Sequence, residues 1–461
     1  MKPQKPPAQE PDGLFKTPLE RFIDMQHPLV GLAERIDWEA LDGEVAGCFG
    51  DVGRPAVPTR FMLGMLILKA MNTLSDEALF DRWTCDPYFQ HFTGETYFQH
   101  RVPHERSGLS HWRNRLGADI LDRLLRESLN VAQSTGALTK CDMEVVTVDT
   151  TVQEKAVRFP TDAALLYTAI TKLGTEARMS GIKLRQSYVR VGKWAQIMAG
   201  RYAHAKQYKR MRKQLKFLKT RLGRVVRDIE RNTEGNPEKQ AAFADSLRKA
   251  RIIGGQALSR RAKPKIYSWH APEVECIGKG KARAPYEFGC KATITTTNGR
   301  AKGGMFILHA DALHGNPFDG HTLGEVLKQT AALTGVTPGR AHVDKGYRGH
   351  KQNIHTPDPA SGLPTRPPWR VFISGRKALK PHLKAELKRR SAIEPVIGHV
   401  KADHRMGRNH LKGRSGDRFN VKMAAIGFNF RRILKWLEAL VLWLILWMRA
   451  DVVDSRKMAV C

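Results

Sequence analysis

Three acidic residues stand where a metal-dependent reaction on a phosphate ester would need them. Asp149 ends the β-branched run MEVVTVD, Asp344 ends the run RAHVD, and Glu394 lies in the later segment RRSAIEPVIGHV. Converging carboxylates repel one another unless cations neutralise them, and their hard oxygen atoms suit Mg²⁺ or Mn²⁺. Two such ions, roughly 3.5–4 Å apart, can activate a water or a 3′-hydroxyl and stabilise the leaving oxygen of an in-line phosphoryl displacement. An aspartate at a strand end is more often a turn former than a ligand, so the prediction rests on all three acids together.

The segment around Glu394 is predicted to be helical, with Pro395 as a kink. At about 100° per residue, Glu394 and Lys401 differ by only some 20° around the axis, and Arg390 lies within about 40° of Glu394. The three side chains therefore share one face, on which two cations flank the carboxylate and could hold DNA phosphates. An exposed ladder of salt bridges within one helix would give the same spacing.

Three further residues near the acids are candidates for DNA contact. Tyr347 and Arg348 lie three and four residues after Asp344, and Lys291 lies in the expected strand EFGCKATITTT. Tyr347 and Arg348 could reach the scissile strand or stabilise the turn after Asp344. Lys291 points from a core strand and could reach a phosphate.

The charge balance indicates a polyanionic partner. The chain has 461 residues with 77 Lys and Arg against 45 Asp and Glu, a net charge of +32. Excess positive charge suits nucleic acid because each neutralised phosphate releases counterions, although ribosome-associated and membrane-surface proteins share the property. The hydrophobic content of 41% is ordinary for a soluble protein.

The cysteines and the chain ends point to a soluble cytoplasmic protein. The six cysteines are scattered without a CxxC pair, which argues against a disulfide scaffold or a zinc site. The N-terminal segment is polar and proline-rich, with no apolar stretch of a secretory signal. The apolar run ALVLWLILWM, residues 439–448, is short of the roughly 20 residues of a membrane span. We interpret it as a buried or subunit-contact helix.

The order of the predicted elements matches one known architecture. A strand at 143–151 is followed by a helical insertion, a hairpin of strands at 287–297 and 304–313 around Asn298-Gly299, a helix at 321–333, strands at 340–347 and 370–374, and a helix at 381–405. With the insertion set aside, the order is close to that of a ribonuclease-H-like mixed five-stranded sheet with flanking helices. In that fold the strands of Asp149 and Asp344 are neighbours, so their carboxylates would meet at one edge of the sheet.

An all-helical domain is predicted before this core. Ser75 is an expected N-cap, and Ser110 another, for a helix that carries Arg113 and Arg115. A short helix with a basic start resembles the helix-turn-helix readers of DNA, and a plain helical bundle would have the same pattern. Arg113 and Arg115 are therefore candidate DNA contacts.

The insertion is strongly basic. Between Arg201 and Arg224 there are ten Lys or Arg and no acid. Its apolar residues follow a 4-3-4-3-4 spacing, a heptad seam that should pack on a partner helix within 237–260: Met211, Leu215, Leu218, Leu222, Val225 and Ile229. The outer face is either a solvated charged surface or a phosphate-binding surface. We favour the latter, with Lys206, Lys209, Arg210 and Lys213 as DNA contacts.

These elements give five segments. We expect a flexible arm at 1–27, a helical DNA-binding domain at 28–140, a catalytic domain at 141–179 and 263–435, the basic helical insertion between its first and second core strands at 180–262, and an apolar C-terminal helix and tail at 436–461.

Several motifs resemble the acidic blocks of bacterial insertion-sequence transposases of the DDE class. The three blocks are VTVDTT, HVDKGYRG and RRSAIEPVIGHVKADHRMGRNHLKG, and YEFGCK and DALHGNPFDGHTL resemble one subgroup. The N-terminal FMLGMLILKAMNTLSDEALFDRW is similar to the helical domain that precedes the core in that subgroup. The resemblance covers about residues 55–160 and 264–435. The third block is the most specific, because Arg390, Glu394 and Lys401 match R-x3-E-x6-K.

The resemblance implies an enzyme that binds the terminal inverted repeats of a mobile element. It would hydrolyse DNA there with Mg²⁺ and transfer the freed 3′-hydroxyl into target DNA, as a homodimer or a higher synaptic oligomer associated with the nucleoid. Asp149, Asp344 and Glu394 would be the metal ligands. Leu387 stands where related families have a Tyr. The insertion lies between the first and second acids, whereas well-known relatives have theirs between the second acid and the Glu. A ribonuclease-H-like nuclease without strand transfer, or an inactive or domesticated DNA-binding protein, remain alternatives.

Overall fold

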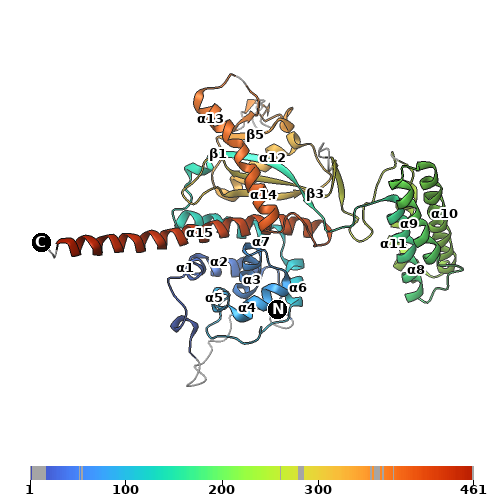
Figure 1. Ribbon diagram of the computed structural model, residues 1–461, viewed down its shortest axis with the longest axis horizontal. Helices are drawn as coiled ribbons and strands as arrows, with labels where there is room; N and C mark the ends of the chain where they lie inside the picture. Colours follow the sequence, from blue (N-terminus) through green and yellow to red (C-terminus); the bar gives the residue numbers. More distant parts are fainter. Residues whose placement is uncertain are drawn as a thin grey trace. The chain divides into compact units, whose positions relative to one another are not determined.

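The chain forms two compact units in the computed structural model (Figure 1). The structure describes residue 2 and residues 17–50, 52, 56–259, 261–278, 285–352, 356–357, 364–365, 368–376 and 378–458. Unit 1 comprises residues 1–154 and 290–461, and unit 2 comprises residues 155–289. Of the arm predicted at 1–27, most residues up to 16 lie outside the described ones. Leu19, in a short 3-10 helix at Leu19–Arg21, is fully buried and its N–H donates to Thr96, so this part of the predicted flexible arm is ordered.

A mixed sheet lies at the centre of unit 1, which confirms the mixed α/β class. Its strands β1 (Val145–Glu154), β3 (Tyr286–Thr297), β4 (Ile307–Leu313), β5 (Arg340–Val343) and β8 (Arg370–Ile373) lie in the order β4-β3-β1-β5-β8. β5 is parallel to both β1 and β8, whereas β3 and β4 are antiparallel. The short strand β2 (Glu275–Gly278) pairs with the first residues of β3 in unit 2, and β6 (Thr356–Pro357) pairs with β7 (Pro364–Thr365).

The predicted hairpin is confirmed, because β3 and β4 pair antiparallel, and residues 298–306, which include Asn298-Gly299, connect them. Asn298 is buried and forms hydrogen bonds with β1. Its backbone N–H donates to Val145 and its side-chain amide donates to Thr147 Oγ1 at 3.0 Å. These bonds tie the end of β3 to β1.

Helices occupy the N-terminal part of unit 1: α1 (Pro28–Arg35), α2 (Trp38–Ala46), α3 (Thr59–Met71), α4 (Asp76–Cys85), α5 (Pro87–Phe92), α6 (Ser107–Arg115) and α7 (Ala118–Ser134). Ser75 caps α4 as predicted, because its side chain accepts from Ala78 N–H. The cap predicted at Ser110 is wrong, since α6 begins at Ser107 and Ser110 lies inside it. α3 is buried nearly all round, which explains its continuous apolar sequence.

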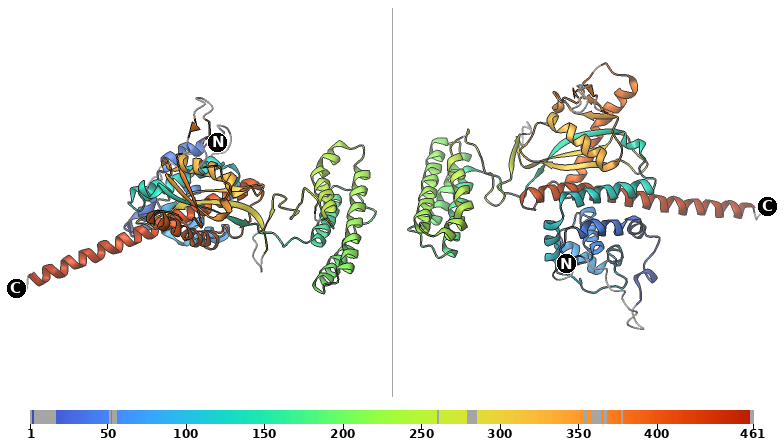
Figure 2. Two further views of the ribbon diagram at one scale, coloured as in Figure 1. Left: turned by 90° about the horizontal axis from the view of Figure 1, so that it is seen from above. Right: turned by 180° about the vertical axis from the view of Figure 1, so that it is seen from behind.

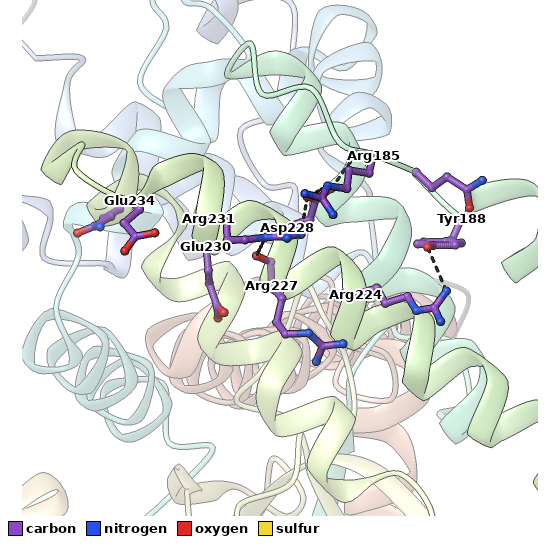
Figure 3. A pocket seen from close by; sticks show the side chains of 10 residues that line it. Arg185, Tyr188, Arg224, Arg227, Asp228, Glu230, Arg231 and Glu234 are labelled. Atoms are coloured by element: carbon purple, nitrogen blue, oxygen red, sulfur yellow. Dashed lines mark hydrogen bonds and ion pairs between the residues drawn. The ribbon is translucent and has the colours of Figure 1, made fainter.

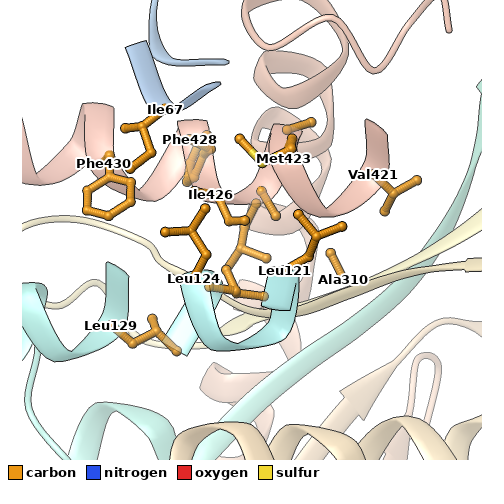
Figure 4. Close-up of a cluster of buried hydrophobic side chains, with 14 of the residues drawn as sticks. Ile67, Leu121, Leu124, Leu129, Ala310, Val421, Met423, Ile426, Phe428 and Phe430 are labelled. Atoms are coloured by element: carbon orange, nitrogen blue, oxygen red, sulfur yellow. The ribbon is translucent and has the colours of Figure 1, made fainter. Parts of the chain in front are cut away.

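One long helix, α15 (Gly413–Met458), contacts both the sheet and the N-terminal helices (Figure 2). Its apolar side chains interlock with those of α3, α7 and β4, among them Ile426, Phe428 and Phe430 (Figure 4). Asn429 is fully buried and bonds both the N–H and the C=O of Ile307 on β4, each at 2.9 Å. A polar residue in this core therefore fixes the position of α15 against the sheet.

The apolar segment predicted as a separate helix from 436 continues α15 without a break. Leu442 and Trp443 are exposed in unit 1. Within the described residues, no helix is long and apolar enough to cross a membrane.

The helix predicted across 381–405 is divided. α13 (Pro381–Arg389) ends in a 3-10 turn at Arg390–Ala392, and α14 (Ile393–Asp403) follows. Pro395 explains the division, because its ring excludes the carbonyl of the residue four positions earlier from a regular helix. Glu394 therefore lies in the first turn of a new helix rather than in the middle of a long one. The other core helix is α12 (Asp319–Thr334).

Unit 2 is built around four helices, α8 (Asp162–Met179), α9 (Val189–His204), α10 (Tyr208–Thr233) and α11 (Pro237–Gln256). The heptad seam is confirmed: Leu215, Leu218, Leu222, Val225 and Ile229 are buried, Met211 packs at their edge, and α10 contacts α11. α10 also packs on α8 and α9. The helical unit thus begins before α8, earlier in the chain than the expected range of 180–262.

Two buried histidines in unit 1 should make stability fall in acid. Burial lowers the pKa of His309 and of His404 to about 4. The unfolded chain, with His pKa near 6.5, therefore takes up these protons first as the pH falls. Their contribution to stability is complete above about pH 6.5 and is lost towards pH 4, amounting to about 2 kcal/mol per histidine between pH 7 and pH 5.

Chemical denaturation of the wild type and of His309→Gln at pH 7 and pH 5 checks this expectation. The Gln variant should lose less free energy of unfolding between the two pH values than the wild type does. Equal losses in both proteins would show that His309 does not titrate as its burial requires.

Candidate active site

Asp149 and Asp344 come from adjacent parallel strands. β1 and β5 pair from Val145↔Arg340 to Thr147↔His342, and both aspartates follow that paired stretch. The Asp149 side chain is only 17% exposed. Burial, aided by the nearby negative charges of Asp344 and Asp319, raises the pKa of Asp149 to about 6, against the opposing effects of a bond from Thr150 N–H and the charge of Arg390. The edge of the sheet thus has an excess of negative charge that a cation would neutralise.

Arg390 connects Asp149 to Glu394. Its Nη1 lies 3.4 Å from Asp149 Oδ2 and its Nη2 lies 3.4 Å from Glu394 Oε1. The guanidinium is largely buried, whereas the Glu394 carboxylate is 65% exposed. The structure therefore brings these three predicted residues together, with the cation between the two acids. Lys401 lies further along α14 and is partly exposed.

A fourth acid, Asp319, lies at this site and was not among the predicted residues. It is the first residue of α12, and its Oδ1 accepts from Thr150 Oγ1 and from Lys291 Nζ, both at 3.1 Å. A Cβ on Gly346 would meet Asp344 Oδ1 at 3.0 Å and Asp319 Oδ2 at 3.4 Å, so both carboxylates border that glycine. The segment DGHTL had the sequence of a helix start, and nothing local marked its Asp as part of the site.

Lys291 and Tyr347 have structural partners at the site. Lys291 Nζ forms an ion pair with Asp319 and donates a hydrogen bond to the carbonyl of Pro317 at 2.7 Å. Tyr347 is 1% exposed, and burial together with the charges of Asp319, Asp149 and Asp344 raises the pKa of its hydroxyl. In this structure the Tyr347 ring is buried rather than presented to a DNA strand, and the predicted contact stays a prediction. Arg348, the next residue, is exposed.

The carboxylates are not gathered as tightly as the ligands of a bound ion. Within the described chain, the group whose possible ligand atoms all lie within 4.8 Å of one another is Cys290, His314 and Asp417. Cys290 Sγ is 3.2 Å from His314 Nδ1, and Asp417 accepts from Asn409 at 2.8 Å. This group combines residues of β3 and α15 and contains none of the predicted acids. At the sheet edge, Arg390 lies between Asp149 and Glu394.

The basic residues predicted to contact DNA lie in different settings. Arg113 is largely buried and forms a bidentate ion pair with Asp76, at 2.9 and 2.8 Å. The hydrogen bonds from Arg113 and Lys69 lower the pKa of Asp76 to about 2. The carboxylate thus occupies donors of Arg113, whose role as a DNA contact stays a prediction. Arg115 is exposed, with its guanidinium over the Phe49 ring. In unit 2, the four predicted residues are all exposed on or just before α10: Lys206, Lys209, Arg210 and Lys213.

Comparison with known proteins relates the chain to transposases. The family described as Transposase domain (DUF772) matches residues 17–115, which contain α1 to α6. An uncharacterized protein, ORF8 in the nfe locus of Rhizobium meliloti, is 42% identical over 208 residues, which are 45% of this chain and the whole of that relative. No solved structure gives a significant match. On these two similarities, the chain belongs to a family of insertion-sequence transposases.

Proposed function

We propose that the protein is a DDE-class transposase with a ribonuclease-H-like catalytic core. It binds the terminal inverted repeats of an insertion sequence, cleaves a DNA strand there and joins the freed end to target DNA. The observation that carries the proposal is the convergence of Asp149 on β1 with Asp344 beyond β5, to which α14 adds Glu394 through Arg390.

The sheet supports the assignment of the core. Its order β4-β3-β1-β5-β8 has an antiparallel pair, β3 and β4, on one side of β1 and two parallel strands on the other. α12 follows β4 and α14 follows β8. This is the arrangement expected of a ribonuclease-H-like sheet interrupted between its first and second strands.

The residues at the sheet edge suit Mg²⁺. Asp149, Asp344 and Glu394 supply hard oxygen ligands, and burial together with the charges of Asp344 and Asp319 raises the pKa of Asp149, so that a bound cation would stabilise its ionised form. Bound there, two Mg²⁺ ions would activate the attacking oxygen and stabilise the leaving oxygen. With its carboxylate partners so engaged, Arg390 is free to bind a phosphate of the substrate strand, for which its planar donors are suited.

The remaining parts are proposed to bind DNA. A transposase domain implies DNA as a partner, and the chain carries a net charge of +32. We assign α1 to α7 and the basic unit 2 to recognition of the element ends and to their pairing in a homodimer or a higher oligomer, and we place the protein at the nucleoid.

A strand-transfer assay tests the proposal. Purified protein, Mg²⁺, a labelled duplex carrying the terminal repeat and a target plasmid should give joined products. Cleavage without joining would replace the proposal with a nuclease, and binding alone would replace it with a DNA-binding protein that has lost catalysis.

Arg390→Gln is expected to lower the cleavage rate by about 10- to 100-fold, the usual effect of removing a residue that orients metal-binding side chains. Arg389→Gln is the matched control, because Arg389 is the exposed neighbour in the sequence. Single-turnover cleavage of the terminal-repeat duplex measures both. Equal rates for the two variants would remove Arg390 from the site.

A further inference from the structure

Unit 2 contains a cavity of about 680 Å³ with an arginine-rich lining (Figure 3). It lies where the segment before α9 meets the second half of α10, and four guanidinium groups face it, those of Arg185, Arg224, Arg227 and Arg231. Three acids are also in the lining, so the number of arginines alone does not define a site. What matters is which of these charges are already paired.

Of the three acids of the cavity, Asp228 and Glu230 are paired, whereas Glu234 is exposed. Asp228 is buried, and its carboxylate accepts from Arg185 N–H at 2.7 Å and from Arg231 Nη2 at 3.1 Å. Glu230 accepts from Arg251 Nη2 at 2.5 Å. Asp228 and Glu230 therefore hold the cavity wall together, since each compensates an arginine.

Arg224 and Arg227 remain available. Both are exposed and lie three residues apart on α10, hence on one side of the helix. Arg224 Nη1 donates to the Tyr188 hydroxyl at 3.5 Å. Among the described residues, neither guanidinium has a carboxylate within ion-pair distance.

A third guanidinium extends the same side of α10. Arg221 lies over the Phe217 ring at 3.9 Å and near Tyr188 at 5.8 Å. Its Nε is buried and has no hydrogen-bond partner in the part of the chain that the structure describes. The aromatic rings orient Arg221 without neutralising it, so its charge adds to that of Arg224 and Arg227.

Guanidinium groups bind phosphate with two parallel hydrogen bonds, which makes uncommitted arginines typical of phosphate sites. A continuous backbone fits this cavity better than a single small anion, because the same helix has no acid from Tyr208 to Arg227 and carries Lys209, Arg210 and Lys213 along it. We propose that the cavity binds the sugar-phosphate backbone of DNA, with Arg224 and Arg227 each holding a phosphate. This proposal assigns a binding site to the DNA partner of the proposed function, and it therefore rests on that function.

Salt-dependent binding tests the site in the full-length protein. Fluorescence anisotropy with a labelled random-sequence DNA duplex gives the affinity over a range of salt concentrations. Each lost phosphate contact lowers the slope of log K against log salt by about 0.9. Arg224→Gln/Arg227→Gln should therefore lower the slope by about 1.8 and the affinity by on the order of tenfold near physiological salt.

Arg248→Gln/Lys249→Gln is the matched control. It removes two positive charges from the same unit, both paired with Asp245 at 2.5 and 2.6 Å. Its slope should stay near that of the wild type. The proposal is overturned if the two double variants behave alike while circular dichroism shows both folded, or if the cavity variant loses affinity only for an RNA duplex of the same sequence. Binding is measured without cleavage, so failure of this site and absence of transposition are distinguishable.

Discussion

Asp149→Asn is expected to lower the rate of Mg²⁺-dependent strand cleavage by on the order of 10³-fold or more. The amide keeps the shape of the side chain but loses the charge that holds the cations. DNA affinity should not fall, because the carboxylate itself repels phosphate and its neutralisation can only favour binding. The folded protein should be at least as stable as the wild type, since burial and nearby acids already raise the pKa of Asp149 to about 6. Single-turnover cleavage, anisotropy and a thermal melt measure the three quantities.

Asp344→Asn and Glu394→Gln should cause the same loss of cleavage. Asp403→Asn is the control for Glu394→Gln, because Asp403 ends the same helix and pairs only locally, with His399 at 2.8 Å. The control should cleave at the wild-type rate. Near-normal cleavage by any of the three site variants would exclude that residue from the active site.

Gly427→Ala is expected to lower the free energy of unfolding by about 3 kcal/mol or more, at the upper end of overpacking effects. Gly427 lies in α15 where this helix touches α3. A Cβ there would lie 2.6 Å from the carbonyl carbon of Ala70 and 2.7 Å from its oxygen. Backbone atoms inside two packed helices cannot move aside as a flexible side chain can, so the helices must separate. Urea denaturation followed by tryptophan fluorescence measures the change.

Gly43→Ala is the matched control in α2. No atom lies within 4 Å of the Cβ that this substitution would add, and alanine is favoured over glycine in a helix interior by about 1 kcal/mol. The control should therefore be as stable as the wild type or more so. If Gly427→Ala were equally harmless, the close contact between α3 and α15 would be wrong.

The sequence was informative where a local pattern and a tertiary contact agree. The β-branched run before Asp149 formed β1, Ser75 capped α4, and the heptad seam on α10 packed as its period required. These features depend on residue types within a few positions of one another, so one chain without relatives was enough to predict them.

Features set by distant partners were missed. Asp319 joins the site through Thr150 and Lys291, which lie 169 and 28 residues away in the chain. The ion pair of Arg113 with Asp76, 37 positions earlier, was likewise not predicted. Such pairs have no periodic signature, because their spacing is decided by how whole elements pack.

Diffraction from crystals of the protein with terminal-repeat DNA and Mn²⁺ tests the central claim most directly. Anomalous peaks are expected at the carboxyl end of β1 and β5, within metal–oxygen bonding distance of Asp149 and Asp344, with Glu394 completing the coordination and Arg390 moved to a phosphate. A complex in which Glu394 stays turned away, and no manganese lies between the two aspartates, would contradict the account.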